Sequence, residues 1–128
     1  MSTYLLDTHS AIWFFNGEKK LSQTARQIIF DPSNHMNISI ASVWELAIKI
    51  STGKLKFPGN SAEFIRVAED NDVFVMPIEP SYLTILEGLP FIHRDPFDRI
   101  LIATAIVEQM TIITADADIV RYDVPHVW

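Results

Sequence analysis

Short apolar runs alternate along the chain with stretches in which apolar residues recur every three or four positions. The short runs contain β-forming residues and indicate strands, whereas the recurring positions have the period of an amphipathic helix. The predicted strands are residues 3–6, 36–40, 73–78, 111–114 and, at the carboxyl end, 122–127. The predicted helices are residues 11–15, 21–30, 42–53, 61–70, 80–89 and 96–110, with a short helical turn at 116–118.

Polar residues mark where several of these helices begin. Ser42 and Glu45 have the spacing of a capping box, and Ser61 is a candidate cap for the helix that follows it. Asp95 is a good N-cap, Pro96 suits the first helical position, and Asp98 complements the helix dipole from the third. The helix opening at Pro96 is the longest and most apolar, so we expect it to be buried against a sheet.

Strands that alternate with helices indicate a parallel sheet covered on both faces. We therefore expect an α/β fold, a three-layer α/β/α sandwich of the doubly wound kind with a mainly parallel central sheet. The chain has 128 residues, which suits a single domain spanning residues 1–128.

Composition and charge narrow the classes of function. The chain is 48% hydrophobic without a continuous apolar run of membrane-spanning length, and it contains no cysteine. We expect a globular, cytoplasmic protein without disulfides or a membrane partner. The net charge of -6 argues against broad electrostatic binding of nucleic acid. It leaves room for a nucleic-acid enzyme whose acidic site takes up a cation.

Four acids are predicted to meet at one edge of the sheet, where ligands of parallel α/β folds bind. Asp7 follows the first strand, Glu45 lies one helical turn after the second, and Asp116 follows the fourth. Asp98 reaches this edge because its helix runs antiparallel to the next strand. Each acid also has a structural interpretation: turn former, capping-box residue or partner of Lys49, dipole-compensating acid, and helix cap, respectively.

Four carboxylates at one edge would repel one another unless protons or a cation reduced their charge. Oxygen ligands of this kind suit Mg²⁺ or Mn²⁺. The hydroxyls of Thr8 and Thr114 are candidates to orient the acids. His9 and His93 are expected to lie outside the site. The aromatic residues expected in the core are Trp13, Phe14, Phe15 and Trp44.

Several segments, in this order, resemble PIN-domain proteins, and most closely the VapC-like ribonuclease toxins of toxin-antitoxin modules. The segments are Asp7-Thr-His, Ser-Val-Trp-Glu45, Ile48-Lys49, Gly53-Lys54-Leu55, Leu89-Pro90, His93-Arg-Asp-Pro-Phe-Asp98-Arg, Ile102-Ala-Thr-Ala and Thr114-Ala-Asp116. The resemblance covers almost the whole chain. The glycine that the family often has before the fourth strand is absent here, where Glu-Gln-Met stands.

The resemblance implies a PIN-like sandwich, cleavage of RNA that depends on Mg²⁺ or Mn²⁺, a homodimer, and inhibition by a cognate antitoxin that also contacts promoter DNA. Carried over by motif, the catalytic and metal-binding acids are Asp7, Glu45, Asp98 and Asp116. The secondary candidates are Thr8, Asp95, Thr114 and Asp118.

Two other classes of function fit an acidic edge. A receiver-like, phosphate-accepting signalling domain would require a phosphorylatable Asp after the third strand, where this chain has Glu79-Pro80. A non-catalytic module would use the carboxylates to bind a basic segment of a partner protein.

Overall fold

The computed structural model describes residues 2–55 and 57–128, which form an α/β fold around a five-stranded sheet. The strand order is β3-β2-β1-β4-β5, and every neighbouring pair is parallel. The strands are β1 (Thr3–Leu6), β2 (His35–Ser39), β3 (Val73–Met76), β4 (Thr111–Ile113) and β5 (His126–Val127). The predicted parallel architecture is therefore confirmed.

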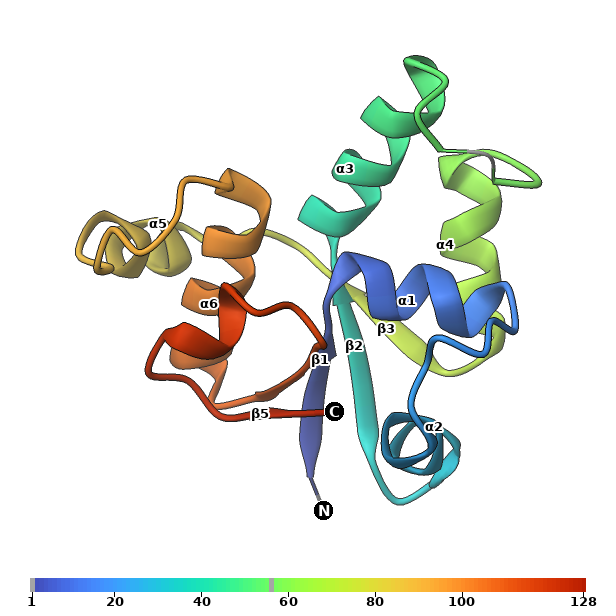
Figure 1. Cartoon of the computed structure of the whole chain (residues 1–128), viewed down its shortest axis with the longest axis horizontal. Coiled ribbons are helices and arrows are strands. Elements are labelled where there is room, and N and C mark those ends of the chain that lie inside the picture. The colour runs from blue at the N-terminus through green and yellow to red at the C-terminus, as the bar shows by residue number, and fades with distance from the viewer. Residues whose placement is uncertain (1, 56) are drawn as a thin grey trace.

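Helices cover both faces of the sheet, as Figure 1 shows. One group, with α5 and α6, lies on one side, and a second group, with α1, α2 and α4, lies on the other. The helices are α1 (Thr8–Phe15), α2 (Gln23–Phe30), α3 (Ile40–Ser51), α4 (Ser61–Asp70), α5 (Pro80–Glu87), α6 (Pro96–Glu108) and the short 3₁₀ helix η1 (Ile119–Arg121). Within the described part of the chain, no helix is long and apolar enough to span a membrane.

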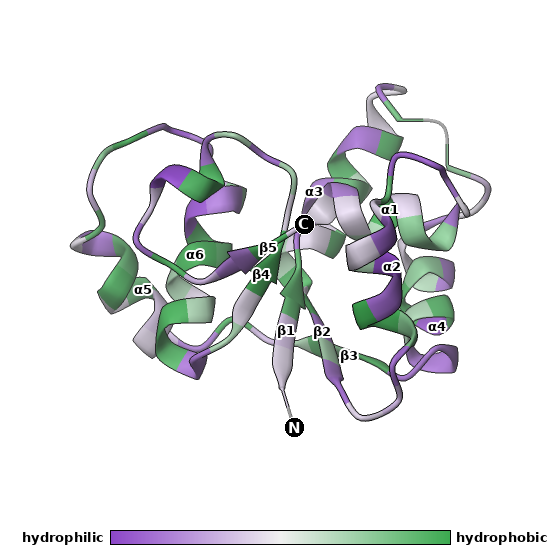
Figure 2. Cartoon of the chain, turned by 60° about the horizontal axis from the view of Figure 1, so that its bottom comes forward, coloured by the Kyte–Doolittle hydropathy of each residue, from purple (hydrophilic) through white to green (hydrophobic). Residues whose placement is uncertain are grey.

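The inner strands β1 and β4 are largely buried on both faces, which explains their continuous apolar character, whereas the edge strand β3 exposes Phe74. Leu5 packs with the side chains of α6, whereas its neighbour Leu6 packs with α1 and α4. Ile112 and Ile113 divide between the two cores in the same way, because successive strand residues point to opposite faces. Figure 2 shows hydrophobic residues along the strands and on the helix faces turned toward them.

Some predicted boundaries and burial assignments are wrong. β2 ends at Ser39, whose hydroxyl caps α3 by accepting from the Ala41 N–H, so the capping box proposed for Ser42 and Glu45 does not form. Asn60, rather than Ser61, caps α4. The last strand begins only at His126. Trp44 was expected in the core, but it is 60% exposed on α3.

The turn between α6 and β4 forces Gln109 into the left-handed region, with φ +56°. A side chain there costs about 1 to 2 kcal/mol, and glycine avoids that cost at some entropic penalty. We expect Gln109→Gly to raise the free energy of unfolding by about 1 kcal/mol, and the melting temperature by roughly 4 °C. Gln109→Ala is the control, because alanine keeps the Cβ. Thermal melts of both variants check this, and equal melting temperatures would contradict it.

Candidate active site

Asp7 is the most enclosed acid at the carboxyl edge of the sheet. It follows β1, and its Oδ1 caps α1 by accepting from the Ser10 N–H at 2.8 Å. Its Oδ2 accepts from the Thr114 hydroxyl at 2.6 Å. Burial raises the pKa of Asp7 above its ordinary value, although the hydrogen bonds from Ser10 and Thr114 oppose the shift. Asp7 is thus a fixed carboxylate in a poorly solvated position.

Thr114 joins two of the predicted acids. While its hydroxyl donates to Asp7, the same oxygen accepts from the backbone N–H of Asp116 at 3.0 Å. The Oδ1 atom of Asp116 accepts from the N–H groups of Asp118 and Ile119, which orders the turn before η1. The end of β4 is thereby fastened to the end of β1.

Asp98 lies in the first turn of α6, with Asp95 as the N-cap. Its Oδ2 atom lies 3.0 Å from Nε2 of His93. The pKa of Asp98 is raised to about 6, mainly by burial and further by the negative charges of Asp95 and Asp116, while the His93 hydrogen bond opposes the shift. The charges of Asp98 and Asp116 therefore interact across the edge of the sheet.

Glu45 is buried on α3, but it faces another part of the same edge. Its carboxylate forms an ion pair of 2.9 Å with Lys49, one turn further along the helix. Glu45 and Asp95 line a separate pocket of about 330 Å³, together with Lys49 and Lys54. The ion pair with Lys49, the structural interpretation of Glu45, is therefore present in the structure. The neighbouring pocket nevertheless reaches Glu45.

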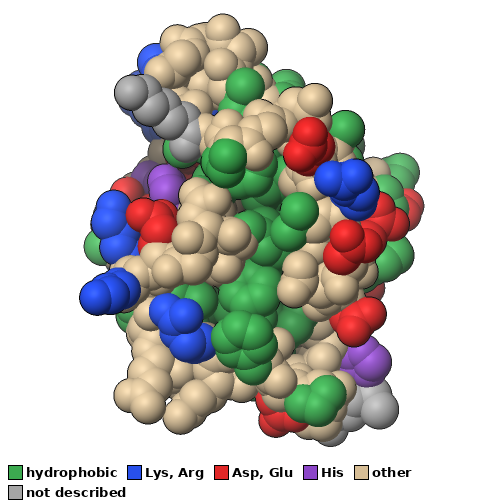
Figure 3. Space-filling model, turned by 90° about the vertical axis from the view of Figure 1, so that its right-hand side faces the viewer, with side chains coloured by type: hydrophobic (Ala, Val, Ile, Leu, Met, Phe, Trp, Pro, Cys, Tyr) green, Lys and Arg blue, Asp and Glu red, His purple; other side chains and the backbone are tan. Residues whose placement is uncertain are grey.

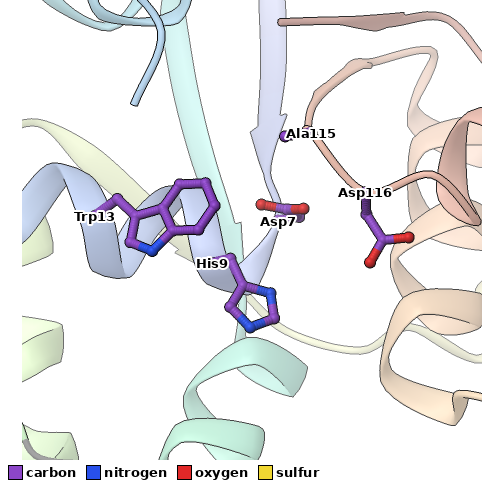
Figure 4. Close-up of a pocket in the computed structure, with 5 residues that line it drawn as sticks. All are labelled: Asp7, His9, Trp13, Ala115 and Asp116. Carbon is purple, nitrogen blue, oxygen red and sulfur yellow. The ribbon is translucent and has the colours of Figure 1, made fainter. Parts of the chain in front are cut away.

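A pocket of about 230 Å³ opens over Asp7 and Asp116. Figure 4 shows Asp7 lying between Trp13 and His9 of α1 on one side and Asp116 on the other. His9 is exposed and its ring lies 5.9 Å from that of Trp13. His9 was expected outside the site, but it lines the pocket that two of the acids share.

The secondary candidates take different positions. Asp95 and Thr114 lie in the acidic region, where each contacts backbone or side-chain groups of the predicted acids. Thr8 instead donates to the Ser42 hydroxyl at 2.8 Å, which ties α1 to α3. Asp118 has a half-exposed side chain that pairs with Arg121 at 3.5 Å.

Sequence reasoning also missed two residues near Asp98. His93 was expected outside the site but contacts Asp98 directly, and Tyr122 was not considered. For His93, the only local indication of a contact with Asp98 was that the two residues lie five positions apart on either side of a helix cap. No local pattern marks Tyr122, which lies 29 residues from His93.

The donor set suits a hard divalent cation. Its members are carboxylate and hydroxyl oxygens, and burial raises the pKa of both Asp7 and Asp98, which a nearby cation would reverse. Across residues 2–55 and 57–128, no three His, Asp or Glu side chains stand close enough to enclose a metal ion by themselves. Mg²⁺ ordinarily needs only one or two carboxylates, with water and substrate phosphates completing its shell. The pocket shared by Asp7 and Asp116 provides such a pair.

Comparisons with known proteins agree with this architecture. A family model described as the PIN domain matches residues 4–125. The chain is 30% identical over 124 residues to Ribonuclease VapC22 of Mycobacterium tuberculosis, covering 91% of this chain and 88% of that protein. It is similar in structure to a chain of VapBC2 from Rickettsia felis bound to a promoter DNA fragment, with a TM-score of 0.75, 15% identity and coverage of 98% and 97%. A chain of a toxin-antitoxin complex from Klebsiella pneumoniae aligns with a TM-score of 0.67, 19% identity and coverage of 98% and 96%.

Proposed function

Because this chain belongs to the PIN-domain family, we propose that it is a ribonuclease that hydrolyses RNA phosphodiester bonds as the toxin of a toxin-antitoxin module. The observation that carries the proposal is the pocket that Asp7 and Asp116 share at the carboxyl edge of the sheet, with Asp98 near enough for the charge of Asp116 to help raise its pKa. A receiver-like domain would also need a phosphorylatable Asp after β3, where this chain has Glu79-Pro80.

We assign Asp7, Asp98 and Asp116 as ligands of one or two Mg²⁺ or Mn²⁺ ions. Glu45 binds an ion or orients water from the neighbouring pocket, where Lys49 holds its carboxylate. A bound divalent ion supplies Lewis-acid activation of water and neutralises charge that develops on the phosphate. The part of the protein is to hold the acids in place: Thr114 and the amino terminus of α1 fix Asp7, and the Asp118 and Ile119 N–H groups fix Asp116.

The path of the RNA strand continues from the acids along α1. A second cavity of about 490 Å³ shares His9 and Trp13 with the Asp7 pocket and extends to Lys20 and Lys49. The Lys20 ammonium lies 5.9 Å from the centre of the Trp13 ring. Positive charge next to an aromatic ring suits a phosphate and a stacked base of single-stranded RNA. Glu18 also lines this cavity and Lys49 is paired with Glu45, so Lys20 is the cation that we assign to the RNA backbone.

An antitoxin is the proposed protein partner, and a row of phenylalanines is the surface we assign to it. Successive ring pairs, 4.8 to 5.6 Å apart, run from α2 across α1 to α4 and the loop before it. The row consists of Phe30, Phe14, Phe15, Phe64 and Phe57. Phe30 is 64% exposed and Phe14, Phe15 and Phe57 are partly buried, whereas Phe64 is buried and supports the row from the core. Figure 3 shows hydrophobic side chains forming a stripe on this side of the molecule.

Negative charge at one end of the phenylalanine row favours a different protein, rather than a second copy of this chain, as the partner. Asp31, Asp70 and Asp72 line the same pocket as Phe14 and Phe30. In a symmetric dimer the same surface meets itself, so these acids would face their own copies. A segment with apolar and basic residues suits the row better. Promoter DNA is contacted through the antitoxin in this proposal, since the toxin has a net charge of -6.

A different apolar surface suits a homodimer. A pocket of about 200 Å³ between α3, α5 and α6 is lined without charged residues, and Trp44 and Leu83 at its margin are 60% and 50% exposed. Such a surface has no like charges to bring together at a two-fold axis. Its lining residues are Ala41, Trp44, Ile78, Leu83, Leu86, Pro96, Phe97 and Ile100.

Expression in a bacterial host tests the toxin assignment. The chain expressed alone is expected to arrest growth and degrade RNA, and co-expression of the small protein encoded beside it should relieve both effects. Phe30→Glu places a charge on a side chain that is 64% exposed, so the fold and the toxicity should persist. Co-expression of the small protein should no longer relieve the toxicity of this variant. The dissociation constant of the complex, measured by titration calorimetry, should rise at least tenfold, because a charge would be buried against the partner.

Phe74→Glu is the matched control, because Phe74 is 61% exposed and is not part of the phenylalanine row. It should be neutralised by the antitoxin as the unaltered chain is. Full relief of the Phe30→Glu variant would remove the row from the antitoxin interface. Absence of toxicity and of RNA cleavage in the unaltered chain would contradict the toxin assignment itself.

A further inference from the structure

The segment between α5 and α6 closes on itself around Arg99. Its guanidinium donates to the Pro90 carbonyl at 2.9 Å and to the Leu89 carbonyl at 3.5 Å, and it lies 4.6 Å from the centre of the Phe91 ring. Arg99 is only 6% exposed, and no carboxylate of the described residues lies within ion-pair distance of it. Burying an unpaired charge is costly, so its remaining hydrogen bond is informative.

That remaining hydrogen bond leads toward the site. Nη1 of Arg99 donates to the hydroxyl of Tyr122 at 3.0 Å. The same hydroxyl lies 2.8 Å from Nδ1 of His93 and 3.4 Å from the backbone N–H of His93. Nε2 of His93 in turn lies 3.0 Å from Oδ2 of Asp98. Four side chains therefore form one continuous chain, Arg99 to Tyr122 to His93 to Asp98.

The numbers of donors and acceptors determine which atom donates at each step of this series of hydrogen bonds. A tyrosine hydroxyl has one hydrogen to donate. Arg99 and the His93 backbone both donate to it, so its oxygen is already the acceptor of two N–H groups. If Nδ1 of His93 also carried hydrogen, the oxygen would face three donors, and its own hydrogen would have only the His93 carbonyl at 3.5 Å. Donation from Tyr122 to Nδ1, at 2.8 Å, satisfies every group.

The direction of the Tyr122–His93 hydrogen bond determines which group of His93 faces Asp98. With Nδ1 as an acceptor, the imidazole hydrogen is on Nε2, which donates to Oδ2 of Asp98. Among the hydrogen bonds of the described residues, Oδ1 of Asp98 has no partner. One carboxylate oxygen is therefore held and the other is left available. Ligand carboxylates in metal sites are commonly held in this way by a neighbouring hydrogen bond.

We propose that His93, fixed in its Nε2–H tautomer by Tyr122 and Arg99, is the positioning residue that presents Oδ1 of Asp98 to the divalent ion. The proposal rests on the function assigned above, because it takes Asp98 as a metal ligand. It also explains why a buried, unpaired Arg99 follows Asp98 directly: its charge-assisted hydrogen bond makes Tyr122 a donor toward His93.

The first test is made on metal-free protein. Two-bond ¹H–¹⁵N correlation spectra distinguish the imidazole tautomers, and His93 should be the Nε2–H form in the unaltered chain. Tyr122→Phe removes the donor to Nδ1 and should yield a mixture of tautomers. Tyr82→Phe is the matched control, since Tyr82 is an equally buried tyrosine whose hydroxyl instead donates to Glu108 at 2.7 Å. An Nδ1–H form in the unaltered chain would overturn the proposal.

The second test measures Mn²⁺ affinity by titration calorimetry without RNA. Tyr122→Phe and His93→Ala should weaken binding by roughly 10-fold to 100-fold, the usual cost of losing a group that holds a metal ligand. His93→Gln should recover part of the loss, because its amide can donate to Asp98. Tyr82→Phe and His126→Gln should bind as the unaltered chain does.

The outcomes separate the two proposals. If the unaltered chain binds Mn²⁺ and the Tyr122 and His93 variants bind it equally well, the positioning role is wrong and the ribonuclease assignment stands. If the unaltered chain binds no divalent ion at all, the metal-dependent function fails and the positioning role fails with it. Melting temperatures of all variants identify any loss of affinity that comes from unfolding.

Discussion

Asp98→Asn is expected to abolish RNA cleavage while leaving the fold intact. Asparagine keeps the size and the hydrogen-bonding capacity of the side chain, so the first turn of α6 and the contact with His93 can persist. The charge that attracts a divalent ion is lost. Since a bound metal contributes several kcal/mol to phosphoryl-transfer chemistry, the rate constant should fall by roughly 10³-fold or more. Single-turnover cleavage of a labelled RNA measures the loss.

The same substitution is expected to stabilise the metal-free protein at neutral pH. The pKa of Asp98 is about 6 in the folded chain, against an ordinary value of 3.8. A raised pKa contributes stability that is fully present below the ordinary value and is lost as the pH rises through about 6. At neutral pH the charged Asp98 should therefore cost about 1 to 2 kcal/mol, allowing for solvent screening of a partly exposed group.

Thermal melts in chelator, from a pH below the ordinary aspartate pKa of 3.8 up to neutral pH, test this stability effect. Asp98→Asn should melt above the unaltered chain at neutral pH, and the difference should vanish when the pH falls below that ordinary pKa. Asp118→Asn is the control, because that side chain is half-exposed and pairs only with Arg121. A destabilised Asp98→Asn protein at neutral pH would mean that the charge on Asp98 is already compensated within the protein.

Removal of divalent ions is the second change with a large expected effect. Without a cation, the acids at the sheet edge repel the RNA backbone, so chelation should eliminate cleavage. Adding Mg²⁺ or Mn²⁺ should raise the melting temperature, as for any ligand that binds only the folded state. The rise should grow between mildly acidic and neutral pH, because the ion competes with the proton that a pKa of about 6 places on Asp98.

Differential scanning calorimetry of the chelated chain, with and without Mn²⁺, measures this shift. The Asp98→Asn variant should show a smaller shift at every pH. An equal shift in both proteins would place the bound ion elsewhere on the molecule.

The parallel sheet and the shared pocket of Asp7 and Asp116 could be predicted from the sequence because both follow from local patterns and one topological rule. Asp7 directly follows β1, Asp116 comes three residues after the end of β4, and Asp98 lies in the first turn of an antiparallel helix, so no long-range packing had to be known. The direction of the Glu45 side chain was harder to predict, because it depends on how the helix is rotated about its axis. α3 also begins two residues before the predicted start.

The rest depended on contacts between distant parts of the chain. Tyr122 reaches His93 only because the segment after η1 packs beside the loop that opens α6, which no periodicity encodes. Trp44 has the composition of a core residue and a helical spacing that suits burial, yet α3 turns it outward beside Phe97. Propensity cannot distinguish a core aromatic from one at an interface.

One cleavage experiment tests the central claim, that the acids at the carboxyl edge of the sheet form a metal-dependent ribonuclease site. A labelled RNA is incubated with chelated protein and with the same protein after Mg²⁺ or Mn²⁺ is restored, for both the unaltered chain and Asp98→Asn. Cleavage is predicted only for the unaltered chain with the ion restored. Cleavage by the unaltered chain in chelator, or by Asp98→Asn at the unaltered rate with the ion restored, would contradict the claim.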